Sequence, residues 1–100
     1  MKIQIRPRGT VLTKTQFACL ERDLYLELAR FGERIGLVIV EIKDAEVPGL
    51  KSCEIEVRIK PQVVKAESSD TDVFLAAEHA VKRAARSVSR AIEAEALIRR

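Results

Sequence analysis

The sequence predicts an α+β fold: a two-layer βαβββα sandwich with a four-stranded sheet and two helices packed on one of its faces. Strand-like apolar patterns lie at residues 2–6, 35–43, 52–60 and 63–67, and helical apolar spacing lies at residues 14–31 and 69–93. A strand–helix–strand unit crosses over right-handed, so the first two strands should be parallel. Short connections should make the later strands antiparallel. Each helix has a single apolar stripe, so both should pack on the same face.

Length and composition are those of one globular domain spanning residues 1–100. The chain is 47% hydrophobic and 33% charged, which argues against disorder. We expect a cytoplasmic protein with no membrane contact, because no apolar run approaches the roughly 18 residues of a membrane span and the N-terminus lacks the apolar region of a secretion signal. The net charge of +3 permits an anionic partner without requiring one.

The first strand is predicted at residues 2–6, where polar and apolar residues alternate. Thr13 and Gln16 form a capping box, which predicts the start of a helix over residues 14–31. Gly32 is the expected left-handed stop. The buried stripe of this helix is predicted to consist of Phe17, Leu20, Leu24, Leu28 and Phe31. Its exposed side mixes both signs of charge, which is typical of a solvated face.

Residues 35–43 form the most β-prone run of the chain and predict a central strand. If the side chains of Val38, Val40 and Ile42 face the helices, Leu37 and Ile39 lie on the open face of the sheet. These two residues indicate either an exposed apolar patch for a partner or simply the middle of a sheet. We favour the second interpretation.

Two further strands complete the predicted sheet. Residues 52–60 alternate cleanly, and the inward set is Cys53, Ile55, Val57 and Ile59. Pro61 and Gln62 indicate a tight reversal. Residues 63–67 predict a short last strand at an edge. We expect both cysteines, Cys19 and Cys53, to be buried reduced thiols.

The last helix should begin with a cap at Ser69 or Asp70, run to about Glu93 and fray beyond it. Acidic residues at Asp70 and Asp72 suit the positive end of the helix dipole. The predicted apolar stripe is Phe74, Ala77, Val81, Ala84 and Val88.

The opposite face of this helix is basic. It carries His79, Arg83, Arg86 and Arg90, with Lys82 at its edge, and no Asp or Glu occurs from His79 to Ile92. Like charges four residues apart, as at Arg86 and Arg90, destabilise a helix by a few tenths of a kcal/mol. An ordinary solvated face is the alternative, but the lack of acids favours phosphate, which arginine binds with two donors at once.

We therefore expect nucleic-acid binding through Lys82, Arg83, Arg86 and Arg90, with Arg6 and Arg8 extending the surface. Only four residues in every hundred are aromatic, which argues against base stacking on single strands and favours recognition of folded RNA by backbone and shape.

Catalysis finds little support in the sequence, and we do not expect an enzyme, a cofactor or a small-molecule substrate. The only histidine, His79, has no Ser, Cys or Asp at a spacing that suggests a triad. The four glycines are scattered and form no phosphate-binding loop. Two cysteines and one histidine are too few to predict a zinc site.

Several segments resemble the ribosome hibernation-promoting factor family, which includes ribosome-associated inhibitor A. The resemblance covers nearly the whole chain. In the first half it is carried by Leu12 and Thr13 followed by Phe17 and Leu20, and by residues 28–31 (LARF) with residues 33–35 (ERI). The most specific match runs from residues 66–67 (AE) to residues 72–77 (DVFLAA). Arg83, Arg86 and Arg90 match a Lys-x-x-Arg-x-x-x-Lys pattern on the family's second helix.

This resemblance implies a βαβββα fold related in layout to double-stranded RNA-binding domains. It implies binding to rRNA of the small ribosomal subunit, where the protein would block translation and protect idle ribosomes under stress. The chain resembles the short form of the family, which lacks an extra dimerisation domain, and we expect a monomer or weak dimer. The alternative hypothesis is a protein-interaction or transcription-regulatory module that docks through Leu37 and Ile39 on the open sheet face.

Overall fold

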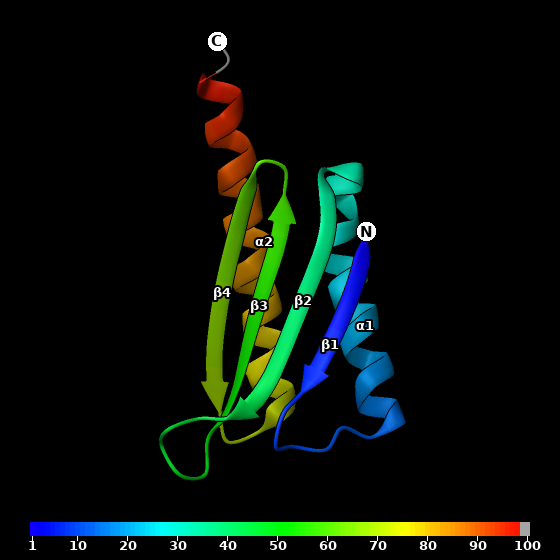
Figure 1. The fold of residues 1–100 in the computed structure, drawn as a ribbon, viewed down its shortest axis with the longest axis vertical. Coiled ribbons are helices and arrows are strands. Elements are labelled where there is room, and N and C mark those ends of the chain that lie inside the picture. The colour runs from blue at the N-terminus through cyan, green and yellow to red at the C-terminus, as the bar shows by residue number, and fades with distance from the viewer. Residues whose placement is uncertain (99–100) are drawn as a thin grey trace.

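The computed structural model describes residues 1–98 and has two layers, a four-stranded sheet and two helices on one of its faces (Figure 1). Its elements are β1 (Lys2–Pro7), α1 (Lys14–Leu28), the 3-10 helix η1 (Ala29–Arg34), β2 (Ile35–Asp44), β3 (Lys51–Ile59), β4 (Gln62–Asp70) and α2 (Val73–Ile98). The predicted α+β class and the βαβββα order are therefore confirmed.

The sheet has the strand order β1-β2-β3-β4, so β1 and β4 are its two edges. β1 pairs parallel with β2, and the β2–β3 and β3–β4 pairs are antiparallel, as predicted. A register shift between Ile35 and Leu37 keeps Ile35 on the buried face together with Val38. α1 lies behind the β1–β2 half and α2 behind the β3–β4 half (Figure 1).

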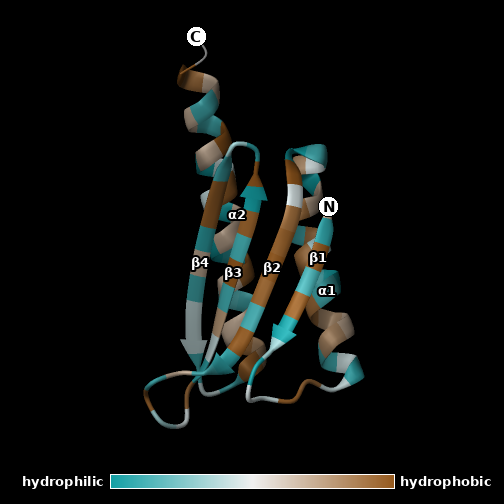
Figure 2. Ribbon diagram, viewed as in Figure 1, coloured by the Kyte–Doolittle hydropathy of each residue, from teal (hydrophilic) through white to brown (hydrophobic). Residues whose placement is uncertain are grey.

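The core lies between the sheet and the two helices. Its largest fully buried side chains are Leu24, Leu28, Ile35, Ile42, Ile55, Val38, Val40, Val57, Val81 and Val88. Burying each such side chain stabilises the fold by about 1.5–3 kcal/mol. Figure 2 shows the corresponding pattern, because β2 is hydrophobic along most of its length while β3 has bands of both kinds. Leu37 and Ile39 are half-buried, and their strand neighbours Val38 and Val40 are buried.

The first helix differs from its prediction at the end. Thr13 and Gln16 form the predicted capping box, and each satisfies the other's backbone N–H. The α-helix ends at Leu28 rather than Phe31, and η1 covers the remaining residues. Gly32 has a positive φ of 59°, which is the left-handed conformation predicted for it. Phe17 is 37% exposed and so lies at the margin of the predicted buried stripe.

The start of α2 corrects the prediction of its cap. Ser69 and Asp70 belong to β4, which extends over Gln62–Asp70 rather than residues 63–67. Asp72 is the cap instead, because its carboxylate accepts a hydrogen bond from the backbone N–H of Phe74 at 2.8 Å. Asp70 accepts from the N–H of Asp72 at 3.0 Å and so shapes the turn that leads into the helix.

α2 also runs further than expected, to Ile98 rather than about Glu93. Its last turns project beyond the end of the sheet (Figure 1), and an ion pair between Arg34 and Glu95 ties them to η1. Phe74 is 45% exposed, so it is not part of the buried stripe, whereas Ala77, Val81, Ala84 and Val88 are. Arg99 and Arg100, part of the predicted frayed end, lie outside the described residues.

Among the described residues, no helix is both long enough and apolar enough to cross a membrane. Both cysteines are free thiols; Cys53 is buried and Cys19 is half-buried. Burial raises the pKa of the Cys53 thiol to about 12.

Candidate nucleic-acid interface

The basic face of α2 is exposed along its length. Its apolar stripe is buried against β3 and β4 because small and β-branched residues recur there at helical spacing: Ala76, Ala77, Ala80, Val81, Ala84, Ala85 and Val88. The alanines let the helix lie close to the sheet. Packing of this stripe leaves Lys82, Arg83, Arg86 and Arg90 exposed on the other side. The predicted orientation of the helix is therefore confirmed.

Three of these cations share a hollow of about 390 Å³ between α2 and β4. The residues that line it are Lys65, Ala66 and Glu67 from β4 and Arg83, Arg86, Ser87 and Arg90 from α2. We call this hollow the basic groove. Four cationic residues and one residue with a carboxylate, Glu67, line it. That carboxylate accepts a hydrogen bond from the Ser52 hydroxyl at 3.1 Å, so it has a partner of its own.

Arg83 is held in place by the edge strand. Its guanidinium donates a hydrogen bond to the backbone carbonyl of Glu67 at 2.8 Å. In the part of the chain that the structure describes, β4 has no further strand on its outer side, so its outward-facing carbonyls need other donors. The bond to Glu67 uses a carbonyl and not a carboxylate, so Arg83 keeps its full positive charge while its position is restricted.

Arg86 and Arg90 are the uncompensated cations of the groove. Within residues 1–98, neither side chain forms a hydrogen bond or an ion pair. They lie four residues apart on one helix, which separates them by about 6 Å along its axis. Two free guanidinium groups at this spacing, beside the fixed Arg83, can bind several anionic oxygens along a line parallel to the helix.

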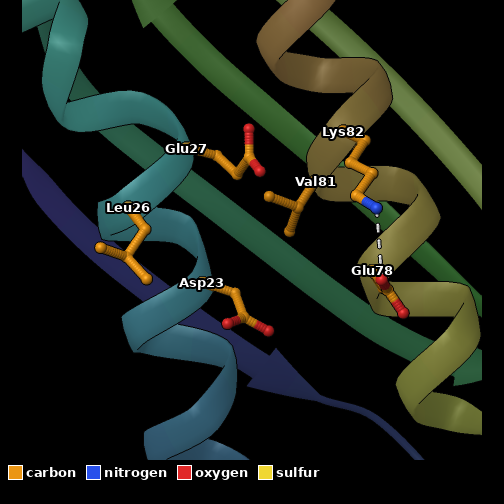
Figure 3. A pocket seen from close by; sticks show the side chains of 6 residues that line it. All are labelled: Asp23, Leu26, Glu27, Glu78, Val81 and Lys82. Atoms are coloured by element: carbon orange, nitrogen blue, oxygen red, sulfur yellow. Dashed lines mark hydrogen bonds and ion pairs between the residues drawn. The ribbon is translucent and has the colours of Figure 1, made fainter.

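Lys82 points to the other flank of α2. Its ammonium forms an ion pair with Glu78 at 3.3 Å and lines a hollow between α1 and α2 (Figure 3). The pair was readable from the sequence, because a glutamate four residues before a lysine is a standard helical pair. Glu78 lies one residue before the acid-free stretch that begins at His79.

The structure does not bring Arg6 and Arg8 together with the helix cations. Arg6 lies on β1, the edge strand opposite β4, and Arg8 follows that strand directly. The Arg8 guanidinium pairs with Glu41 at 3.2 Å, and the Arg6 guanidinium donates to the side-chain oxygen of Gln4 at 2.9 Å. These two arginines therefore form a separate cationic region, and each already has a partner.

Lys65 was missed by sequence reasoning. The sequence places a lysine on the predicted edge strand, but no spacing along the chain indicates that this strand borders the arginines of the last helix. Only the packing of α2 beside β4 brings Lys65 and the arginines to one groove. Its ammonium lies 3.9 Å from Glu56, which also pairs with Arg58 at 3.0 Å, so one carboxylate serves two cations.

In the described part of the chain, no group of three or more metal-binding side chains is close enough to hold an ion. The arrangement of the basic groove is suited to binding anions and contains no pair of groups arranged for proton transfer or nucleophilic attack.

Comparison with known proteins gives a consistent picture for the fold. No family model and no curated protein sequence matches the chain. Among solved structures, a ribosomal subunit interface protein from Coxiella burnetii superimposes with a TM-score of 0.81 at 14% identity, covering 93% of this chain and 99% of that one. The N-terminal domain of Protein Y from Thermus thermophilus superimposes with a TM-score of 0.75 at 25% identity, covering 90% and 98%. The resemblance to the ribosome hibernation-promoting factor family, predicted from the sequence, is therefore confirmed by two solved structures of that family.

Proposed function

We propose that the protein binds RNA of the small ribosomal subunit through the basic groove and the adjoining face of α2. The observation that carries this proposal is the pair of exposed, unpaired guanidinium groups of Arg86 and Arg90 beside the fixed Arg83. Such groups are costly side by side on a helix unless an anion meets them. The likeness to a protein named for the ribosomal subunit interface supports the ribosome as the source of that anion.

The physical role of the fold is to hold the cations still. The apolar stripe of α2 is buried against the sheet from Ala76 to Val88, so the cations of the groove project from a supported stretch of helix. A phosphate backbone that meets this support releases counterions and does not need to order a flexible segment. The binding would then depend on backbone shape and charge, with little reading of base identity.

Bound in this way, the protein inhibits translation and keeps ribosomes idle under stress. A folded domain measuring 47 × 26 × 17 Å fills a channel that mRNA and tRNA would otherwise occupy. This part of the proposal rests on the family resemblance and acts by steric exclusion. It requires neither catalysis nor a cofactor, and a ribosome-bound protein of this kind acts in the cytoplasm.

Three of the predicted contacts are less well placed to bind RNA: Lys82, Arg6 and Arg8. Lys82 is paired with Glu78, and Arg8 with Glu41, so each would have to exchange a carboxylate for a phosphate. Arg6 is exposed but lies at the opposite edge of the sheet from the basic groove. We propose Arg83, Arg86 and Arg90 as the main phosphate contacts and Arg6 and Arg8 as peripheral ones, while Lys82 neutralises Glu78.

The test is charge reversal within the groove. Replacing Arg83, Arg86 and Arg90 by Glu should abolish co-sedimentation with small ribosomal subunits on sucrose gradients at low salt. The far-UV circular dichroism of the variant should stay that of the folded protein, because all three side chains are exposed. Unchanged sedimentation of the folded variant would refute the proposal.

The alternative, a module that docks on proteins through Leu37 and Ile39, stays a prediction. Wild-type binding to the subunit at low and high salt separates the two functions. Phosphate contacts weaken steeply with salt, by somewhat less than one unit of log K per contact for each unit of log salt. Docking through the apolar patch would be nearly insensitive to salt.

A further inference from the structure

The two flanks of α2 carry opposite charge. The flank beside β4 is the basic groove. The flank beside α1 borders a hollow of about 140 Å³ lined by Asp23, Leu26, Glu27, Glu78, Val81 and Lys82. Figure 3 shows the carboxylates of Asp23 and Glu27 directed from α1 into the space between the helices, with Val81 opposite them. We call Asp23, Glu27 and Glu78 the acidic seam.

Little positive charge neutralises the acidic seam. Glu78 has the Lys82 ammonium at 3.3 Å, and the pair carries no net charge. Among residues 1–98, the one ion-pair partner of Asp23 is Arg22 at 3.9 Å, whose side chain is 70% exposed. Glu27 forms neither a hydrogen bond nor an ion pair with any residue from 1 to 98. The seam thus presents three carboxylates against the Lys82 ammonium and the more distant Arg22 guanidinium, so its net charge is opposite in sign to that of the groove.

A phosphate backbone distinguishes these flanks by simple electrostatics. A phosphate about 4 Å from a carboxylate is repelled by about 1 kcal/mol in a water-like medium and by about 4 kcal/mol near a protein surface. Salt limits the reach of this repulsion to about 8–10 Å. The seam therefore acts on RNA that would lie over the α1–α2 side, and much less on RNA beside β4.

We infer that the bound RNA backbone follows the basic groove along α2 and β4, that Lys65 is a further phosphate contact, and that the acidic seam keeps the backbone off the α1–α2 side. This inference rests on the proposed function and adds the path of the RNA to it. Lys65 and Arg90 both line the groove. The Lys65 ammonium is turned toward Glu56 on the open face of the sheet, so it contacts a backbone strand in the groove by swinging over the edge strand β4. On this path Lys82 neutralises Glu78 and does not bind RNA.

A matched pair of lysine variants tests the path. Lys65 and Lys82 have similarly exposed side chains, 64% and 56%, and each has a glutamate partner. Lys65→Ala should weaken binding to small subunits about fivefold at low salt and lower the slope of log K against log salt by about 0.7–0.9. Lys82→Ala should leave both quantities unchanged within about twofold. Equal losses from the two variants, or a larger loss from Lys82→Ala, overturn the inference.

The role of the seam needs its own experiment. Neutralising it with Asp23→Asn and Glu27→Gln should tighten binding, and in this background Lys82→Ala should become costly because RNA gains access to that flank. An effect of Lys82→Ala that is the same in both backgrounds overturns the role assigned to the seam.

The experiments give one result if the inferred path of the RNA is wrong and another if the proposed function itself is wrong. Replacing both Arg86 and Arg90 by Ala tests the groove itself. If that variant binds subunits as well as the wild type, the proposed function fails. If it binds weakly while Lys65→Ala binds normally, the groove binds RNA and only the path is wrong.

Discussion

Arginines lie at both edges of the sheet, but the interaction partners of the two sets differ. Arg6 and Arg8 belong to the β1 edge, where a side-chain amide and a carboxylate already engage them. Arg83, Arg86 and Arg90 lie beside the β4 edge, where a backbone carbonyl engages the first and nothing engages the other two within the described residues. Both sets appear equally basic in the sequence.

The difference shows that the number of arginines is a poor guide to a binding surface. A surface cation paired with a carboxylate contributes little field beyond the pair. A cation paired with a carbonyl keeps its charge, and an unpaired one is also free to reorient toward a ligand. The fold therefore determines which arginines can attract RNA, because it pairs Arg8 with Glu41 and, among the described residues, leaves Arg86 and Arg90 without a carboxylate partner.

The largest expected effect separates the two edges directly. Arg86→Ala with Arg90→Ala should weaken binding to small subunits about a hundredfold at low salt, since hydrogen bonds to charged groups contribute about 1.5–3 kcal/mol each and 1.4 kcal/mol is tenfold in affinity. Arg6→Ala with Arg8→Ala removes the same charge and should cost less than about threefold. Equilibrium binding of labelled protein to purified subunits measures both affinities. Equal losses of affinity would show that the two edges of the sheet do not differ in RNA binding.

A thiol titration checks that neither double variant has unfolded. Burial raises the pKa of the Cys53 thiol to about 12, so at pH 8 it remains protonated as well as enclosed. Cys19 is only half-buried. A thiol reagent should therefore label one cysteine quickly and Cys53 only on unfolding. Rapid labelling of both would mean that the lost binding reflects a lost fold.

A smaller effect on RNA binding is expected when the cations near the β1 edge lose their carboxylate partner. Glu41 pairs with Arg8 at 3.2 Å and lies 3.8 Å from the Lys43 ammonium. Glu41→Gln should release both cations and raise non-specific affinity for RNA about two- to threefold at low salt, with the gain lost near 0.2 M salt. Filter binding to an unrelated structured RNA measures it. If the variant gains no affinity at any salt concentration, pairing with Glu41 is not the reason that this edge binds RNA weakly.

The smallest effect concerns stability and compares two arginines of one groove. Arg83→Ala removes the hydrogen bond to the Glu67 carbonyl and should lower the free energy of unfolding by about 0.5–1.5 kcal/mol. Arg86→Ala should be neutral or slightly stabilising, because alanine is the stronger helix former and a like-charge repulsion with Arg90 disappears. Urea unfolding measures both. Identical results for the two variants would contradict the positioning role of Arg83.

Much of the fold could be predicted from the sequence because local pattern and burial agree. Alternation placed Cys53, Ile55, Val57 and Ile59 inward on β3, and all four are buried. The capping box at Thr13 formed as expected, since both of its bonds join residues three apart. The helical period of α2 likewise determined that Arg86 and Arg90 face away from the core.

The predictions that failed concern the ends of β4 and α2, where contacts with residues distant in the sequence determine how far each element extends. β4 continues to Asp70 because β3 supplies a matching residue for each position, from Gln62 paired with Ile59 to Asp70 paired with Lys51. With Asp70 in the ladder, the helix cap moves to Asp72. α2 continues past Glu93 in part because Arg34, far along the chain, pairs with Glu95.

The sequence by itself determined the order of elements, the buried side of each one and the clustering of arginines on one helix, because these follow from periods of two and 3.6 residues along the chain. Only the tertiary structure decided which of those arginines stay unpaired, that Lys65 joins them and that the opposite flank is acidic. Charges act through space between elements that the chain separates by many residues. No spacing within one strand or helix contains that information.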